Sequence, residues 1–277
     1  MSLFSRQRTE AASLPQEGRL PGFDGATGWL NSEPLTTEDL RGKVVLVDFW
    51  TYTCINWLRT LAYVRAWSEK YAGGLVVVGV HTPEFPFERD VDNVRWAARE
   101  MNVAYPIALD PAYAVWEAFA NNYWPAVYIA DAEGRIRHHH YGEGGYDECE
   151  RVVQQLLGET GDFVTVSPTG FEVQADWENL ESPETYLGSQ QRERRTDSAS
   201  DSLRLNQWSL SGDWTVASRA SILGAGDGTI AYRFHARAPA AGTERPPRPR
   251  AAAGRVRCRS VSPRRAPRGH ARCSESR

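Results

Sequence analysis

Residues 42–54 read GKVVLVDFWTYTC, and this stretch decides the fold. Its residues 44–50 form a near-continuous apolar run, typical of parallel strands that are buried on both faces. Beyond Cys54, apolar residues recur at helical spacing up to about Tyr71, where a pair of glycines supplies the stop. The sequence therefore predicts a buried strand that leads directly into a helix, with Cys54 at the junction.

The segments after this junction alternate between strand and helix patterns. Parallel strand-helix-strand units that end in a hairpin and a closing helix predict an α/β fold, a thioredoxin-like sandwich with a central mixed sheet, over residues 20–157. Residues 1–19 are expected to form a flexible N-terminus. The expected elements are a strand at 75–80, a helix at 88–101, an extended piece at 105–109, a helix at 112–121, strands at 126–130 and 135–141, and a helix at 147–157.

The character of the chain changes after Leu157. Residues 158–202 are expected to form a linker, and residues 203–237 an incomplete β-sandwich with strand-like pieces at 203–209, 214–222 and 229–234. Residues 238–277 are predicted to be a disordered basic tail, because they hold eleven Arg and few core-forming side chains. The tail is either a genuine basic arm or the product of a frameshift near Ala238, and the abrupt end of the strand pattern favours the frameshift.

Charge and composition exclude several classes of function. The tail carries a surplus of nine positive charges, so the rest of the chain, at −12, lacks the basic face that nucleic-acid binding requires. No leader-like apolar segment and no run of about eighteen apolar residues occurs, so we expect no membrane segment and, for the chain as written, a cytoplasmic protein. The four cysteines lack the paired short spacings of a zinc site, and neighbouring residues of the 138–140 histidine run point to opposite faces of a strand. We therefore expect no metal and no cofactor.

Cys54 is the candidate nucleophile. Its sulfur would face the free N–H groups and the positive end of the helix that it opens, which should lower the thiol pKa. A thiolate is the species that attacks disulfides or peroxides. The alternative is a structural cysteine in the core, which a strand-to-helix junction makes less favourable.

Several strings of sequence resemble one family. They resemble the thioredoxin-like half of DipZ-type proteins, within the wider TlpA and redoxin group, and the later strings continue the resemblance into that family's C-terminal β-sandwich. The strings are FWTYTCIN at 49–56, VGVHTPEF at 78–85, YWPA at 123–126, HHYGEG at 139–144, SPETYLG at 182–188, LNQW at 205–208 and GDWTV at 212–216.

The resemblance implies roles for individual residues. It implies a cis peptide bond at Trp124–Pro125 opposite the cysteine, and a glutamate, Glu84, that assists proton movement. It also implies a second cysteine three residues after Cys54, where this chain has Trp57. Related modules act outside the cytoplasm. The predicted substrate groove consists of Trp50, Thr51, Trp57, Trp124 and Pro125.

Three functions remain open from the sequence. The leading one is a thiol-disulfide oxidoreductase in which the Cys54 thiolate attacks a protein disulfide or a low-molecular-weight disulfide to form a mixed disulfide, which an external thiol resolves. The expected partners are therefore a disulfide-containing protein or a low-molecular-weight thiol. Resolution by Cys149, in the closing helix, is a less favoured variant. The second function is a one-cysteine thiol peroxidase, because Thr51 to Cys54 fit the T-x-x-C pattern of peroxiredoxins. The third is a catalytically lapsed module that binds partners through the groove.

Overall fold

The structure is a computed structural model. It describes residues 14–169, 172–174, 181–183, 185–190, 194–197, 202–218, 220–224, 227–236, 250–260 and 271–276. The chain forms two compact units, Met1–Gln174 and Ala175–Arg277. Among the described residues, no helix is both long enough and apolar enough to span a bilayer.

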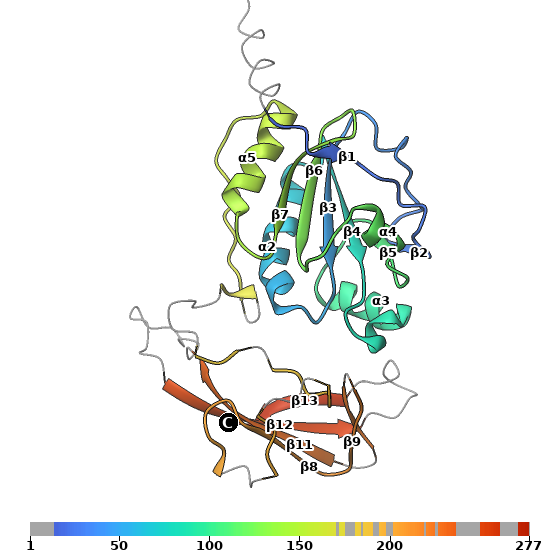
Figure 1. The fold of residues 1–277 in the computed structure, drawn as a ribbon. Helices are drawn as coiled ribbons and strands as arrows, with labels where there is room; N and C mark the ends of the chain where they lie inside the picture. The colour runs from blue at the N-terminus through green and yellow to red at the C-terminus, as the bar shows by residue number, and fades with distance from the viewer. Residues whose placement is uncertain are drawn as a thin grey trace, which may run out of the picture. The chain divides into compact units, whose positions relative to one another are not determined.

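The first unit is built on a mixed seven-stranded sheet (Figure 1). The strand at its centre, β3 (Val44–Trp50), is buried along its whole length, as the apolar run predicts. It pairs in parallel with β4 and antiparallel with β6. The order across the sheet is β1 (Gly18–Arg19), β7 (Arg135–Tyr141), β6 (Ala126–Ala130), β3, β4 (Leu75–His81), β5 (Ile107–Leu109) and β2 (Gly28–Leu30).

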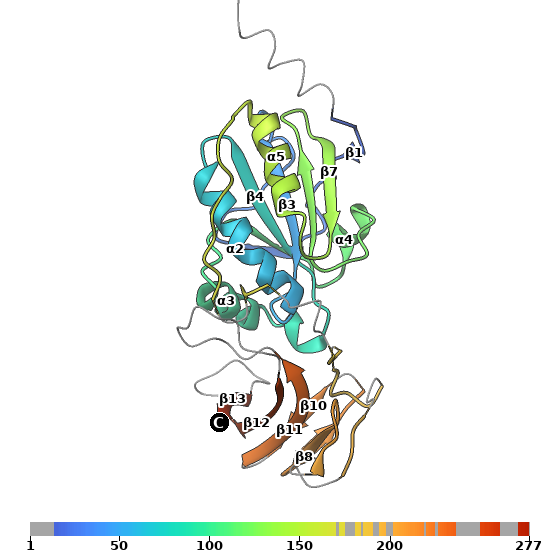
Figure 2. The same cartoon turned by 90° about the vertical axis from the view of Figure 1, so that its left-hand side faces the viewer.

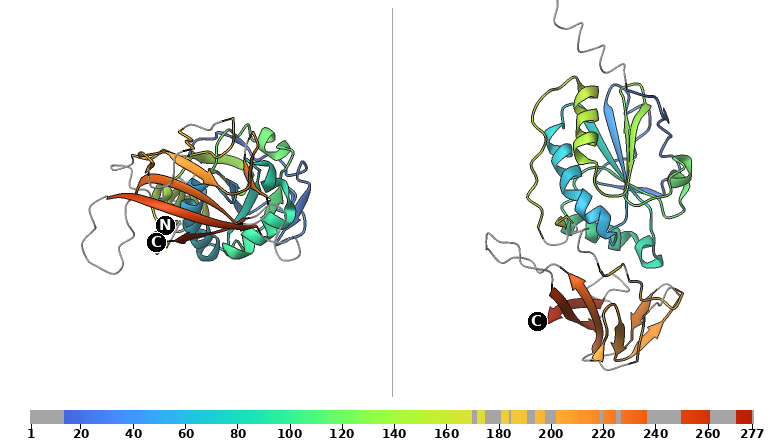
Figure 3. Two further views of the ribbon diagram at one scale, coloured as in Figure 1. Left: turned by 90° about the horizontal axis from the view of Figure 1, so that it is seen from below. Right: turned by 60° about the vertical axis from the view of Figure 1, so that its left-hand side comes forward.

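Helices cover both faces of this sheet, and alternate residues of β3 enter two separate cores. Helices α2 (Ile55–Lys70), α3 (Val91–Glu100) and α5 (Tyr146–Leu157) pack on the face that receives Leu46 and Trp50. The short helix α4 (Ala114–Ala118) packs on the opposite face. Figure 2 and the right-hand view of Figure 3 show α2 and α5 side by side over one face of the sheet. This arrangement confirms the thioredoxin-like α/β sandwich.

Two local details differ from the sequence prediction. The single helix expected at 88–101 is instead a 3₁₀ turn, η1 (Pro86–Arg89), followed by α3. The chain leaves the helical conformation at Asp90, whose side chain accepts a hydrogen bond from Asp92 N and caps α3. The edge strands β1 and β2 were not expected, because two and three residues are too short to show a periodic pattern.

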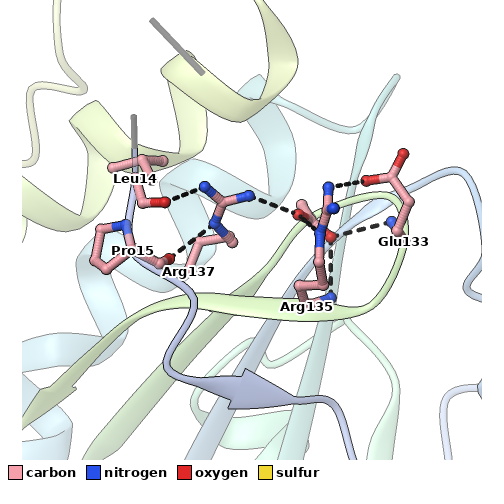
Figure 4. Close-up of polar contacts among 6 residues, drawn as sticks. Leu14, Pro15, Glu133, Arg135 and Arg137 are labelled. Carbon is pink, nitrogen blue, oxygen red and sulfur yellow. Dashed lines mark hydrogen bonds and ion pairs between the residues drawn. The ribbon is translucent and has the colours of Figure 1, made fainter. Parts of the chain in front are cut away.

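The described part of the N-terminal segment is tied to the sheet (Figure 4). The guanidinium group of Arg137, which is 8% exposed, donates to the carbonyl oxygens of Leu14 and Pro15. It also pairs with Asp131 at 3.0 Å, and the same carboxylate pairs with Arg135 at 2.7 Å. Of the segment expected to be flexible, 1–19, residues 14–19 are held by these contacts and by β1, whereas residues 1–13 lie outside the described residues.

The segment after α5 also packs on the first unit. Buried Glu150 accepts hydrogen bonds from Trp67 Nε1 at 3.0 Å, Tyr71 Oη at 2.5 Å and the backbone N–H of Val164 at 2.9 Å. Lys70 completes the cluster at 3.0 Å. The beginning of the expected 158–202 linker is thus held against α2 and α5.

The second unit contains short antiparallel strands. A four-stranded sheet has the order β13 (Ala271–Ser276), β12 (Arg250–Ser260), β11 (Asp227–Ala236) and β8 (Trp208–Ser211). The strand expected at 214–222 is a hairpin of β9 (Trp214–Val216) and β10 (Ser221–Leu223), because the chain turns where Ala217 N bonds to Ala220 O. Within the expected tail, strands β12 and β13 are described, and residues 238–249, 261–270 and 277 lie outside the described residues.

Candidate active site

Cys54 lies at the end of the turn that connects β3 to α2. The strand ends at Trp50, a turn follows, and Cys54 is the N-cap residue of the helix, with an extended backbone (φ −72°, ψ 109°). Its carbonyl accepts the first helical hydrogen bond, from Leu58 N at 3.0 Å. The side chain is partly exposed and free of any disulfide. A helix start leaves its first N–H groups without intrahelical partners, so the sulfur lies at the positive end of the α2 dipole.

The sulfur faces the loop before β6. Cys54 Sγ lies 3.8 Å from the carbonyl oxygen of Trp124, and the Trp124–Pro125 peptide bond is cis, as predicted. The indole N–H of Trp124 donates to the carbonyl oxygen of Thr82 at 3.0 Å, which ties this loop to the end of β4. Residues that are seventy positions apart in the chain therefore form one site around the thiol.

Three of the five predicted groove residues do not line a groove. The side chains of Trp50, Thr51 and Trp57 are each 0% exposed, so the prediction that they contact a substrate is wrong. Trp57 points inward because it shares a helix face with buried Leu61 and stacks on Trp50, with ring centroids 4.4 Å apart.

The remaining two groove residues lie beside the sulfur. Trp124 is partly exposed, whereas Pro125 is buried. Tyr123, which precedes them, is 53% exposed and packs against Tyr141, with ring centroids 4.8 Å apart. The loop before β6 therefore presents exposed or partly exposed aromatic side chains, and its Trp124 carbonyl contacts the sulfur.

A buried carboxylate lies beneath the site. Asp48, on β3, is 0% exposed and accepts hydrogen bonds at Oδ2 from Trp57 Nε1 at 3.0 Å and from Tyr105 Oη at 3.3 Å. Burial raises the Asp48 pKa to about 7, although both hydrogen bonds act to lower it. Sequence reasoning missed this residue, and the available signal was a single acidic residue inside a buried apolar strand.

A buried carboxylate that the sequence did not single out, that of Glu88, contacts the Cys54 loop. Glu88 is 0% exposed, and its Oε1 accepts a 2.5 Å hydrogen bond from Oγ1 of Thr53, the residue before Cys54. Its Oε2 accepts from the backbone N–H groups of Glu84 at 2.7 Å and Phe85 at 2.8 Å. Glu88 therefore joins the cysteine loop to the segment that follows β4, and Glu84 contributes a backbone donor to that junction.

Cys149 is unsuited to resolve a mixed disulfide. It is 2% exposed, and burial raises its pKa to about 12, so the thiol stays protonated at neutral pH. Its Sγ lies 3.6 Å from Nε2 of His138, which points into the protein from β7. The next histidine, His139, contacts Glu17 at 2.7 Å. Among the described residues, no group of three or more His, Cys, Asp or Glu side chains could hold a metal ion.

In the comparison with known proteins, two family models match two separate parts of the chain. The redoxin family model matches residues 17–156, and the model described as thioredoxin-like C-terminal domain matches residues 182–248, beyond Ala238. Protein DipZ of Mycobacterium tuberculosis is 37% identical over 244 residues, which are 82% of this chain and 35% of DipZ. The chain thus spans about a third of the length of that relative.

Smaller proteins match the first unit alone. Thiol-disulfide oxidoreductase YkuV of Bacillus subtilis is 34% identical over 142 residues, which are 51% of this chain and 95% of YkuV. A thioredoxin-like protein solved in solution in its oxidised form is 34% identical, with a TM-score of 0.48, over 52% of this chain and 97% of that one.

Proposed function

Because this chain belongs to the redoxin family, we propose that it is a thiol-disulfide oxidoreductase that acts through the Cys54 thiolate alone and requires an external thiol for turnover. The observation that carries the proposal is the placement of Cys54, partly exposed at the start of α2 and opposite the cis-Pro125 loop. The position three residues further along holds the buried indole of Trp57. Trp57 offers no sulfur to release a captured substrate.

Two opposing effects act on the Cys54 thiol. The first-turn N–H groups and the dipole of α2 stabilise a thiolate. The Trp124 carbonyl, 3.8 Å away, accepts a hydrogen bond only from the protonated thiol. The proposal requires that the helix effect is the larger one, so that a useful fraction of thiolate exists near neutral pH.

The reaction proceeds by thiol-disulfide exchange. The Cys54 thiolate attacks one sulfur of a substrate disulfide, a Cys54–substrate S–S bond forms, and the other substrate sulfur leaves as a thiolate. An external thiolate then attacks the Cys54 sulfur and releases the substrate. A second external thiolate attacks the external sulfur bound to Cys54, which regenerates the Cys54 thiolate. Two external thiols are oxidised to one disulfide, and the substrate disulfide gains two electrons and two protons.

The peroxidase alternative has less support. In the T-x-x-C pattern the threonine hydroxyl would have to reach the reacting peroxide. Thr51 is 0% exposed, and its buried Oγ1 makes no hydrogen bond to any described residue. The hydroxyl is therefore not presented at the surface where a peroxide could approach Cys54.

A capture experiment tests the proposal. The reduced protein carries Cys258→Ser and Cys273→Ser in the background. We expect it to form a mixed disulfide with one equivalent of a small aromatic disulfide and to show no further turnover. Added 2-mercaptoethanol should convert this capture into continuous reduction of insulin. Cys54→Ser should abolish both activities, and Cys149→Ser should leave both unchanged. Absence of any capture by Cys54 would overturn the proposal and favour the partner-binding module.

A further inference from the structure

The Trp124 indole is held by three residues from other segments of the first unit. Its Nε1–H donates to the carbonyl oxygen of Thr82 at 3.0 Å. Its ring packs on Trp116, with centroids 4.2 Å apart, and meets the Tyr113 ring edge to face at 6.3 Å. We call Thr82, Tyr113 and Trp116 the Trp124 seat. Because a hydrogen bond and two ring contacts hold the indole, the seat also restricts where the main chain of Trp124 can lie.

One buried residue binds all three members of the seat. Asp110, which follows β5, is 0% exposed, and its Oδ2 accepts hydrogen bonds from Thr82 Oγ1 at 3.0 Å and from Trp116 N at 2.9 Å. Its carbonyl oxygen accepts a hydrogen bond from Tyr113 N at 3.2 Å. Thr82 is also 0% exposed, so water does not replace these contacts if one of them is removed. The geometry of the seat therefore depends on Asp110.

The main chain that the seat holds is in contact with the reacting sulfur. The carbonyl oxygen of Trp124 lies 3.8 Å from Cys54 Sγ. A carbonyl oxygen can accept a hydrogen bond from the thiol but not from the thiolate, so this contact favours the protonated form. The start of α2 favours the thiolate. A displacement of the Trp124 carbonyl would therefore change the balance between the two forms of Cys54.

Such a balance matters for thiol-disulfide exchange. The thiolate is the attacking species, but its intrinsic nucleophilicity falls as the thiol pKa falls. The best attacking thiol therefore has a pKa near the ambient pH. A carbonyl group fixed beside the sulfur limits how far the helix start can lower that pKa.

We propose that Asp110 is a positioning residue for the Cys54 thiol. Through Thr82 it fixes the Trp124 carbonyl group against the sulfur and so limits the fraction of thiolate. The contacts run from Asp110 Oδ2 to Thr82 Oγ1, from the Thr82 carbonyl oxygen to Trp124 Nε1, and from the Trp124 carbonyl oxygen to Cys54 Sγ. This inference rests on the proposed function and adds a residue that regulates its nucleophile.

The pH profile of Cys54 alkylation tests the proposal, in a Cys258→Ser, Cys273→Ser background. Thr82→Val removes the hydroxyl group but keeps the shape of the side chain and the charge of Asp110. We expect it to lower the Cys54 pKa by about 0.5, which corresponds to the loss of one ordinary hydrogen bond to the protonated thiol. Asp110→Asn should shift the pKa in the same direction. Thr82→Ser retains the hydroxyl group and should keep the parent value.

Two further variants separate positioning from a general loss of stability. Trp124→Phe removes the indole N–H and keeps a ring in the seat, so Thr82→Val should not lower the Cys54 pKa further in that background. Asp131→Asn is the matched control, because Asp131 is a buried carboxylate at the opposite end of β6 from Pro125. It should leave the Cys54 pKa at the parent value.

Several outcomes would overturn the inference. They are a Cys54 pKa that Thr82→Val leaves unchanged, an equal shift in Asp131→Asn, and a full further shift from Thr82→Val in the Trp124→Phe background. A shift in Asp110→Asn without one in Thr82→Val would mean that Asp110 acts through its charge alone, which also contradicts positioning.

Capture of a small aromatic disulfide, measured on the same proteins, separates this inference from the proposed function. If the parent captures the disulfide and Thr82→Val leaves the Cys54 pKa unchanged, the positioning role fails while the proposed function stands. If the parent captures no disulfide, the proposed function fails and this inference with it.

Discussion

The indole N–H of Trp57 donates a 3.0 Å hydrogen bond to Oδ2 of Asp48, deep beneath the Cys54 loop. The family resemblance implies a second cysteine at the Trp57 position. The indole thus occupies the space below the nucleophile and binds a buried carboxylate whose pKa is raised to about 7. An indole rather than a thiol therefore follows Cys54 at this spacing, and Asp48 is a buried carboxylate that can accept a proton.

Trp57→Cys should create an internal resolving thiol. We expect this variant to reduce insulin catalytically with a dithiol donor and to release the captured disulfide without 2-mercaptoethanol. Asp48→Asn in the same background should slow the release, because the buried carboxylate no longer accepts the proton of the new thiol. Removal of the buried indole should lower the free energy of unfolding by about 3–5 kcal/mol. A Trp57→Cys protein that still stalls at the mixed disulfide, although folded by circular dichroism, would contradict this expectation.

Asp48 should make stability depend on pH. Its folded pKa of about 7 lies above the unfolded value of about 3.9, so the folded state holds the proton between these values and the unfolded state does not. The Asp48 contribution is therefore fully present below about pH 4 and is lost as the pH rises to about 7, by up to about 4 kcal/mol. Urea unfolding at several pH values, compared with Asp48→Asn, isolates this slope. Parallel curves for the two proteins would exclude a shifted Asp48 pKa.

Glu88→Gln should loosen the Cys54 loop. The amide keeps one oxygen for Thr53 but places an NH₂ group against the backbone N–H groups of Glu84 and Phe85. We expect a loss of roughly 1–3 kcal/mol in the free energy of unfolding and slower alkylation of Cys54. Glu100→Gln is the control, because the Glu100 side chain is exposed at the end of α3, and both quantities should stay near the parent values. An alkylation rate unchanged by Glu88→Gln would remove the positioning role.

Arg137→Ala should release the segment before β1. The substitution removes the donors to Leu14 and Pro15 and one partner of buried Asp131, at a cost of about 3 kcal/mol. Limited proteolysis within residues 14–19 should also be faster in Arg137→Ala than in the parent protein. Arg135→Ala removes a more exposed partner, 38% accessible, and should cost at most about 1 kcal/mol. Equal effects of the two substitutions would contradict the anchoring role of Arg137.

The strand and helix pattern of the first unit was predictable, because its clearest sequence patterns extend over many residues. The buried run of β3 and the helical spacing after Cys54 each exceed six residues, and the structure reproduces both. The edge strands β1 and β2 are stabilised by pairing with distant strands and leave no local signal. The break at Asp90 depends on a single capping side chain, which the charge pattern of the segment obscures.

The site was predictable in part. Cys54 and Pro125 came from a strand-to-helix junction and from family resemblance, respectively. The inward direction of Trp57 could have been read from its four-residue spacing to Leu61. The contact between Glu88 and Thr53 could not be predicted, because it depends on the 3₁₀ turn η1, which the sequence pattern does not separate from α3.

The most direct test of a Cys54 thiolate mechanism is the pKa of that thiol, measured by pH-dependent alkylation in a Cys258→Ser, Cys273→Ser background. The buried Cys149 should react far more slowly and serve as an internal reference. We expect a Cys54 pKa clearly below the value of about 8.5 for free cysteine, as the start of α2 requires. A pKa at or above that value would mean that the Trp124 carbonyl outweighs the helix, and the single-thiolate mechanism would be contradicted.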